Sequence, residues 1–347
     1  MFQFRKIDAA QHASHGDSFP LFDWLRFALA SIVALHHENL IGWGPAGNLA
    51  VQIFFALSGW LIGGILLRTD AHKLPRFYFN RATRIWIPYA IAVAVLYGLS
   101  VVREPITPAF FNFLIIDLTF THNWLIDVVP SVLATMPLEG TGNHFWSISV
   151  EEQFYLAAPL MIVLLPFGRS IRFWGVVAAA AVLSRWWYGA ISLGVLAAVV
   201  RSSVGDWHLK HPAYVAAAAG GALALVLAVP DSYAFAAPFI AIGVVLLTAR
   251  SGQRSPIGEF AGGISYPLYL YHWVGAFAVA FAVKHGVEIP MVCAYLVAVA
   301  VGAAAYLAID RNIMRWRAAY YSPLVGKSLM VTAYSLLCCG LLWGALT

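Results

Sequence analysis

The first apolar segment of the chain carries ionisable side chains that could move a proton. Asp23 and Arg26 lie near its start, and His36 and His37 lie near its end. At about 100° per residue in an α-helix, His37 falls about 20° from the face of Arg26 and Asp23 falls about 60° from it. His36 is rotated about 80° the other way. An imidazole on this polar seam could take a proton from a hydroxyl near neutral pH. The alternative is a His–His–Glu cap where the helix meets water.

Two adjacent carboxylates, Glu151 and Glu152, interrupt another apolar segment, Phe145–Leu160. Carboxylates at membrane depth cost a few kcal/mol each, so they are rare unless they face a polar cavity. Ser147 is the i, i+4 neighbour of Glu151, so the two glutamates cannot both share that face. We therefore expect one carboxylate to reach a cavity and the other to pair with an arginine. Purely structural ion pairing is the alternative.

Polar and small residues also interrupt the second apolar segment. Asn48 and Gln52 are one turn apart, and we expect them to line the cavity. Ser58 and Gly59 are expected to pack, because small residues let two helices approach closely.

Two arginines, Arg81 and Arg84, are spaced i, i+3 and share one face at a helix start just below the membrane. Guanidinium groups make bidentate hydrogen bonds with phosphates, so the pair could bind a phosphorylated ligand. The alternative is that both arginines only anchor a cytoplasmic loop, as the positive-inside rule describes.

A second polar stripe lies later in the chain. Ser265, Tyr269 and His272 are spaced i, i+4, i+7 on one helical face. Tyr271 and Trp273 are typical of an aromatic belt at the membrane interface. His272 is the candidate for a polar role in this segment, with Tyr269 beside it in the cavity.

The composition indicates a polytopic membrane protein. Hydrophobic residues make up 61% of the 347 residues and charged residues 11%, and the mean hydropathy is +0.77. A soluble domain carries about 25% charged residues. The net charge of +5 reflects membrane topology and does not indicate nucleic-acid binding, because no soluble basic domain is present. The three cysteines lack the spacing of metal ligands, so we expect them to be small buried hydrophobic residues and expect no metal.

Apolar runs predict an all-α bundle of about 10–11 transmembrane helices. The eleven expected spans are 22–40, 48–67, 85–102, 145–166, 172–184, 188–201, 212–230, 233–249, 264–283, 289–309 and 328–346. With the N-terminus in the cytoplasm and two helices within 172–201, about 17 of the 21 cations fall inside. The outer loop Arg103–His144 is long enough to form a lid over an outward-facing site.

Five segments together resemble the acyltransferase-3 family of membrane-bound O-acyltransferases. They are FDWLRFALASIVALHH, IFFALSGWLI, RFYFNRATRIWIPY, FWSISVEEQFYLAAP and ISYPLYLYH, in the family's order over most of residues 21–311. Two positions depart from the family pattern. Trp24 replaces the usual small residue after the aspartate, and Asp310-Arg311-Asn312 stands where the family has an acidic–basic–proline sequence.

The resemblance implies roughly ten helices, a cytoplasmic acyl-CoA donor and transfer to a hydroxyl, usually on a carbohydrate. It places the family's essential histidine on His37 and its arginine on Arg26. It places the Arg–x–x–Arg pair on Arg81 and Arg84, which would hold the CoA phosphates. The paired glutamates fall on Glu151 and Glu152. His37 would be a general base or an acyl relay, while Arg26 and one glutamate order the site.

The expected organisation is a cytoplasmic tail (1–20), a membrane acyltransferase domain (21–311), and a basic cytoplasmic segment with an extra membrane helix (312–347). The expected reaction is transfer of acetyl from acetyl-CoA to a surface polysaccharide, lipopolysaccharide or lipid-linked glycan, in a bacterial inner membrane. One alternative is acylation of a small molecule such as a macrolide sugar. Another is a proton-coupled carrier of glycans or lipids, in which the same groups form a proton relay.

Overall fold

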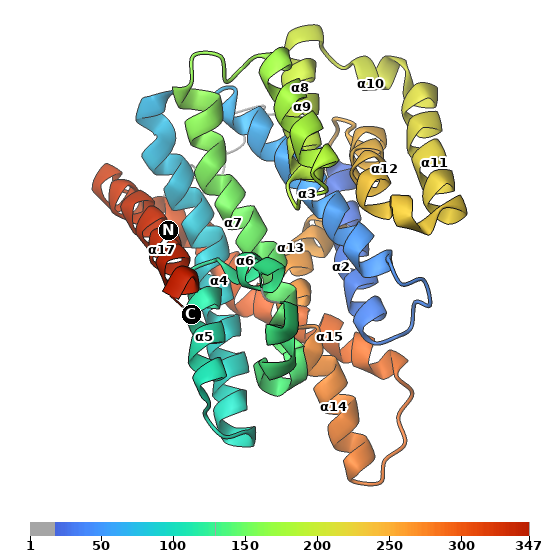
Figure 1. Cartoon of the computed structure of the whole chain (residues 1–347), viewed down its shortest axis with the longest axis vertical. Helices are drawn as coiled ribbons and strands as arrows, with labels where there is room; N and C mark the ends of the chain where they lie inside the picture. Colours follow the sequence, from blue (N-terminus) through green and yellow to red (C-terminus); the bar gives the residue numbers. More distant parts are fainter. Residues whose placement is uncertain (1–17, 129, 347) are drawn as a thin grey trace, which may run out of the picture.

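The computed structural model describes residues 18–128 and 130–346, and these residues form a bundle of helices (Figure 1). None of them is in a β-strand, so the all-α prediction is confirmed. Residues 1–17 of the expected cytoplasmic tail lie outside the described residues. The main helices are α2 (Pro20–His37), α3 (Ala46–Leu66), α4 (Leu74–Arg103), α5 (Pro108–Leu118), α6 (His122–Val128), α7 (Phe145–Pro159), α8 (Ile171–Leu183), α9 (Gly189–Val204), α10 (Trp207–Lys210), α11 (Pro212–Ala228), α12 (Tyr233–Thr248), α13 (Pro256–Tyr271), α14 (Trp273–Lys284), α15 (Val292–Ala305), α16 (Arg311–Tyr320) and α17 (Pro323–Leu346).

Several helices are long and apolar enough to cross a membrane. Among the described residues, six stretches meet this test: Ala46–Leu66, Ala71–Arg103, Pro137–Leu164, Pro230–Thr248, Val292–Tyr320 and Pro323–Leu346. The bent pair α13–α14 makes a seventh if it is one span. The apolar helices α5, α8, α9 and α11 are shorter. The protein is therefore an integral membrane protein, and the sequence-based count of about 10–11 spans includes α2 and three of these shorter helices.

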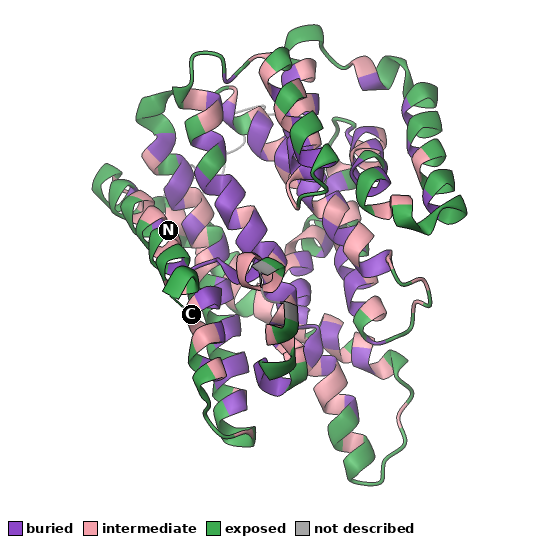
Figure 2. Cartoon of the chain, viewed as in Figure 1, coloured by how far each residue is buried: buried purple, intermediate pink, exposed green. Residues whose placement is uncertain are grey.

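The centre of the bundle is closely packed, and its outer helices expose apolar surface (Figure 2). α3 crosses α9 where two glycines meet: a Cβ added to Gly59 would lie 3.1 Å from the Cα of Gly194. The packing role expected for Gly59 is therefore confirmed. α8 and α9 are separate helices, joined by a turn in which Arg185 has a φ of 54°. This confirms the prediction of two helices within 172–201.

The predicted span 264–283 is not one straight helix but a bent pair of helices. α13 and α14 meet at a bend of 58°, and His272 is the residue between them. The Nδ1 atom of His272 lies 2.8 Å from the carbonyl oxygen of Tyr269. Breaks in membrane helices are tolerated where side chains take over freed backbone hydrogen bonds, and this contact does so.

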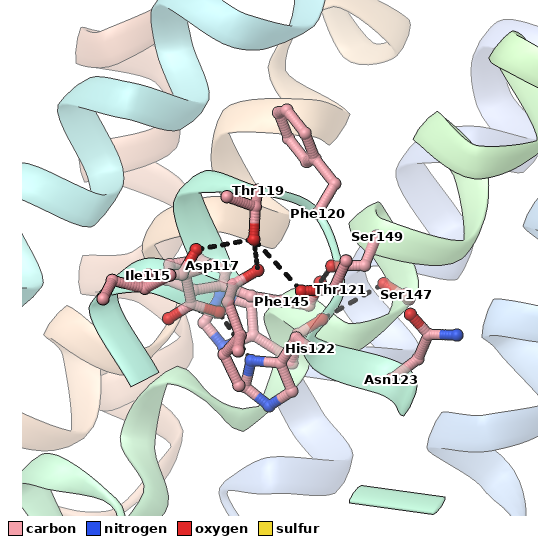
Figure 3. Close-up of polar contacts among 12 residues, drawn as sticks. Ile115, Asp117, Thr119, Phe120, Thr121, His122, Asn123, Phe145, Ser147 and Ser149 are labelled. Carbon is pink, nitrogen blue, oxygen red and sulfur yellow. Dashed lines mark hydrogen bonds and ion pairs between the residues drawn. The ribbon is translucent and has the colours of Figure 1, made fainter. Parts of the chain in front are cut away.

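The expected lid, Arg103–His144, is instead largely helical and packs on the bundle. α5 contacts α4 and α7, and α6 contacts α7. Asp117 on α5 is fully buried, and its carboxylate lies 2.5 Å from Nδ1 of His122 and 2.6 Å from the hydroxyl of Tyr97. Figure 3 shows Asp117 and His122 beside Thr119, whose hydroxyl forms a hydrogen bond with the hydroxyl of Thr121. Buried hydrogen bonds to an acidic residue therefore hold this region in place.

The C-terminal region is more continuous than expected. α15 passes through a π-helical turn, Tyr306–Asp310, directly into α16. α17 lies at the edge of the molecule against α4 (Figure 1). The hydroxyl of Tyr334 on α17 lies 2.8 Å from that of Tyr78 and donates to the Leu156 carbonyl at 2.9 Å. Cys338 and Cys339 are exposed on α17, not buried as expected.

Candidate active site

A cavity of about 920 Å³ runs through the bundle between α2, α3, α4, α7, α13 and the α15–α16 helix. Its cationic lining residues are Arg26, Arg81, Arg84, Arg254, Arg311 and Arg315. Its carboxylates are Asp23, Glu151, Glu259 and Asp310. Six guanidinium groups against four carboxylates give the lining a net positive formal charge, which favours an anionic ligand.

One end of the cavity lies where α2 and α13 begin. Asp23 is buried, and its carboxylate forms ion pairs with Arg26 at 3.5 Å and with Arg254 at 3.2 Å. A Cβ added to Gly262 on α13 would lie 2.8 Å from the Asp23 side chain, so only a glycine permits this approach. Arg254, which is distant in the sequence, thus lies in the cavity beside Asp23 and Arg26.

The arginine pair expected at a helix start lies further inside a helix. α4 begins at Leu74, so Arg81 and Arg84 are in its second and third turns. Both line the cavity. The guanidinium carbon of Arg81 lies 5.9 Å from the centre of the Tyr155 ring, a cation–π contact. Its Nε is buried without a hydrogen-bond partner among the described residues, which leaves a donor available to a ligand.

The structure separates the two adjacent glutamates. Glu151 lines the cavity and accepts a hydrogen bond from the Ser58 hydroxyl on α3. Ser58 itself lines the cavity, so its expected role in helix packing alone is wrong. Glu152 points elsewhere and accepts a hydrogen bond of 2.9 Å from Nε1 of Trp86. We expected the second glutamate to pair with an arginine, but the carboxylate of Glu152 is hydrogen-bonded to the indole of Trp86 instead.

Beyond the other end of the cavity lies a group of histidines. Ser147 and Tyr269 line this end, and their hydroxyl oxygens are 2.5 Å apart. His37, the last residue of α2, lies outside the cavity lining, and its Nδ1 is 2.8 Å from Nε2 of His272. The ring of His144 lies 4.8 Å from the ring of His272.

Along the bundle axis, the cavity reaches Tyr269, and the histidines lie just beyond its lining. Arg26 and His37 are eleven residues apart on α2, about 16 Å along the helix. Tyr269 joins the two regions, because its side chain lines the cavity and its carbonyl oxygen contacts His272. A long anionic ligand held among the arginines could therefore present its far end near His37.

Asn48 and Gln52 lie away from this cavity, contrary to expectation. The Tyr233 hydroxyl on α12 donates to Oδ1 of Asn48 at 2.7 Å, which ties α3 to α12. Oε1 of Gln52 is buried without a hydrogen-bond partner among the described residues. The His36 ring packs against Gly47, where a Cβ would lie 2.5 Å from it. The two histidines of α2 thus have different surroundings.

Sequence reasoning missed several residues that the fold brings to the site. Arg254, Arg311 and Arg315 line the cavity with the arginines of α4. Arg311 and Arg315 are spaced i, i+4 on α16, a pattern that could have been read as a second guanidinium pair. The sequence-based expectation instead places Arg315 in the basic cytoplasmic segment (312–347) and Arg311 at the last position of the membrane domain (21–311). Within the described residues, no group of three potential metal ligands is close enough to hold an ion.

Comparisons with known proteins agree with these features. Residues 12–308 match the model of the acyltransferase-3 family, described as an acyltransferase domain. The chain is 30% identical over 151 residues to the peptidoglycan O-acetyltransferase OatA of Listeria monocytogenes, covering 42% of this chain and 24% of that protein. A "putative O-acetyltransferase" of Staphylococcus aureus is 29% identical over 182 residues, covering 45% and 28%.

Another relative is similar over most of its length. The "putative membrane-bound transacylase BcsY" of Komagataeibacter xylinus is 26% identical over 350 residues, covering 90% of this chain and 87% of that protein. The matches to the first two relatives, in contrast, span about a quarter of their length. No solved structure matches the chain.

Proposed function

The chain belongs to the acyltransferase-3 family and is a membrane O-acyltransferase, and on that premise we propose that it transfers acetyl from acetyl-CoA to a carbohydrate hydroxyl. The proposed acceptor is a surface polysaccharide, lipopolysaccharide or lipid-linked glycan. We place the protein in a bacterial inner membrane with its N-terminus in the cytoplasm. In this orientation the arginine-rich end of the cavity faces the cytoplasmic pool of acetyl-CoA.

The observation that carries the proposal is the gathering of six arginines in one elongated cavity. CoA is a long anion with a diphosphate and a 3′-phosphate at one end and the thioester at the other. Guanidinium groups bind phosphates through paired hydrogen bonds. Arg81 and Arg84 hold phosphates in this proposal, and Arg311 and Arg315 add a second pair from α16, which packs against α4. The pantetheine arm then extends toward Tyr269.

The histidines beyond Tyr269 carry out catalysis in this proposal. His37 acts as general base on the acceptor hydroxyl, whose oxygen attacks the thioester carbonyl carbon. A new C–O bond forms as the C–S bond breaks, and the proton on His37 passes to the departing thiolate. Arg26, held by Asp23, and Glu151, held by Ser58, set the charge balance along the cavity. The donor and acceptor thus meet at the end of the cavity away from the arginines.

A transfer assay with purified protein tests this proposal. The protein is placed in lipid nanodiscs with [14C]acetyl-CoA and lipid-linked oligosaccharides from cells that lack the gene. We expect label to appear in the carbohydrate and to be released as acetate by mild base, as for an ester. The His37→Ala variant is the control and should transfer none. Folded wild-type protein that binds no acetyl-CoA and transfers no label would overturn the proposal and favour a carrier.

A further inference from the structure

Two groups linked by a hydrogen bond, the Tyr269 carbonyl and the His272 ring, hold the ring of His37. Nδ1 of His272 lies 2.8 Å from the Tyr269 carbonyl oxygen, and Nε2 of the same ring lies 2.8 Å from Nδ1 of His37. The two imidazole planes are inclined by only 11°. With the ring centroids 4.8 Å apart, the 2.8 Å separation of the two nitrogens is within the range of an N–H···N hydrogen bond.

The Tyr269 carbonyl fixes where the protons are. A carbonyl oxygen can only accept, so Nδ1 of His272 must carry a hydrogen and donate it. In a neutral imidazole the other nitrogen is then an acceptor. Nε2 of His272 therefore accepts from Nδ1 of His37. The Nε2 atom of His37 is left unprotonated, which is the form that a general base needs.

We propose that His272 is a positioning residue that fixes His37 in the tautomer with a bare Nε2, ready to accept the proton of the acceptor hydroxyl. The inference rests on the proposed role of His37 as base. When Nε2 of His37 takes the proton, its Nδ1–H still donates to His272, so the imidazolium keeps its orientation. The proton then leaves from Nε2 to the CoA thiolate, and His272 returns unchanged.

The surroundings of His272 keep it in this orientation. Its side chain is buried, and the ring of His144 packs against it at 70°. His144 is also buried, with its Nδ1 3.1 Å from the Thr141 carbonyl oxygen. The Tyr269 hydroxyl donates to the His144 carbonyl at 2.9 Å. These contacts exclude water, which would otherwise compete for both nitrogens of His272.

A structural role for His272 has to be separated from the positioning role, because the same residue caps the break between α13 and α14. Two substitutions each keep one of the two hydrogen bonds of His272 and remove the other. His272→Asn places an amide near the position of Nδ1, so it can still donate to the Tyr269 carbonyl but does not reach His37. His272→Gln places its amide oxygen near the position of Nε2, so it can still accept from His37 but loses the cap.

The positioning role predicts that His272→Gln retains more activity than His272→Asn. We expect His272→Asn to lower kcat about 10- to 100-fold, less than the about 10²–10⁴-fold loss expected when the base itself is removed. The KM for acetyl-CoA should stay unchanged, because the arginines that bind the donor lie elsewhere. His208→Asn is the control for loss of a buried imidazole: Nε2 of His208 contacts the Ala249 carbonyl oxygen at 3.0 Å outside the cavity, and asparagine does not reach that oxygen. This variant should retain wild-type kcat.

The tautomer itself can be observed without any turnover. Nitrogen-15 NMR of histidine-labelled protein, with His37 assigned by comparison with His37→Ala, should show a protonated Nδ1 and a bare Nε2. In His272→Asn this pattern should be lost. A wild-type His37 protonated on Nε2, or His272→Asn outperforming His272→Gln, would overturn the inference. If the wild type showed the expected tautomer but transferred no acetyl, the proposed function alone would fail.

Discussion

Replacing each of the adjacent glutamates by glutamine should give opposite results, because the structure gives the two carboxylates different partners. Glu151 lines the cavity and accepts from Ser58, whereas Glu152 accepts from Trp86 outside it. Glutamine keeps the shape of glutamate and removes its charge. We expect Glu151→Gln to lose most of the transfer activity and Glu152→Gln to keep it.

The size of each effect follows from the bond that is changed. A hydrogen bond to a charged group contributes about 1.5–3 kcal/mol. Glutamine at position 151 can still accept from Ser58, but the bond is then neutral; the difference from a bond to a charged group, about 1–1.5 kcal/mol, lowers kcat/KM about 5- to 10-fold for Glu151→Gln, because Glu151 lines the cavity. In the Glu152→Gln variant the new amide oxygen can still accept from Trp86, so the cost there should be about 1 kcal/mol or less.

The assay is acetyl transfer from labelled acetyl-CoA in nanodiscs, with the amount of folded protein matched by gel filtration. Ser58→Ala adds a second test, because it removes the donor to Glu151. The loss in the double variant should be smaller than the sum of the two single losses, since both substitutions act on the same interaction. Equal losses in the two glutamine variants, or an inactive Glu152→Gln beside an active Glu151→Gln, would refute the assignment of Glu151 to the site.

Three further predictions concern the base, the donor site and the topology. His37→Ala should lower kcat about 10²–10⁴-fold, whereas His36→Ala should retain substantial activity; similar losses in both would contradict the choice of His37. Arg81→Ala or Arg84→Ala should raise the KM for acetyl-CoA before that for the acceptor, with only partial rescue by lysine, and unchanged CoA binding in the double variant would reduce the pair to topological anchors. Ser322→Cys in a cysteine-free background should react with an impermeant thiol reagent only after the inner face is opened; labelling of intact cells would reverse the orientation of the later helices.

The helices could be predicted because their apolar runs are long and local. The break between α8 and α9 was also predictable, because the distribution of cations favoured two helices over one. The bend at His272 was not, because it depends on a side chain replacing a backbone hydrogen bond. The packing of Arg103–His144 was missed for a similar reason: Asp117 is buried only because Tyr97 and His122 bond to it.

The candidate site was predictable where one helix carries it. Helical rotation alone placed Asp23 and Arg26 together, and both line the cavity. Rotation could not choose between the glutamates, because that choice depends on Ser58, which lies 93 residues before Glu151 in the chain. It could not find His144 or Arg254 either, since their roles come from contacts with residues far away in the sequence. Residue spacing predicts only which side chains share a face of one helix, whereas side chains from several helices form the site.

We propose that this chain transfers an acyl group from acyl-CoA to a hydroxyl of a cell-surface carbohydrate. Mass spectrometry of surface glycans tests it most directly, with three strains compared: wild type, gene deletion, and deletion complemented with His37→Ala. We expect a mass step of one acetyl group that is present in the wild type and absent from both other strains. Identical glycans in all three strains, or an acetyl group restored by His37→Ala, would contradict it.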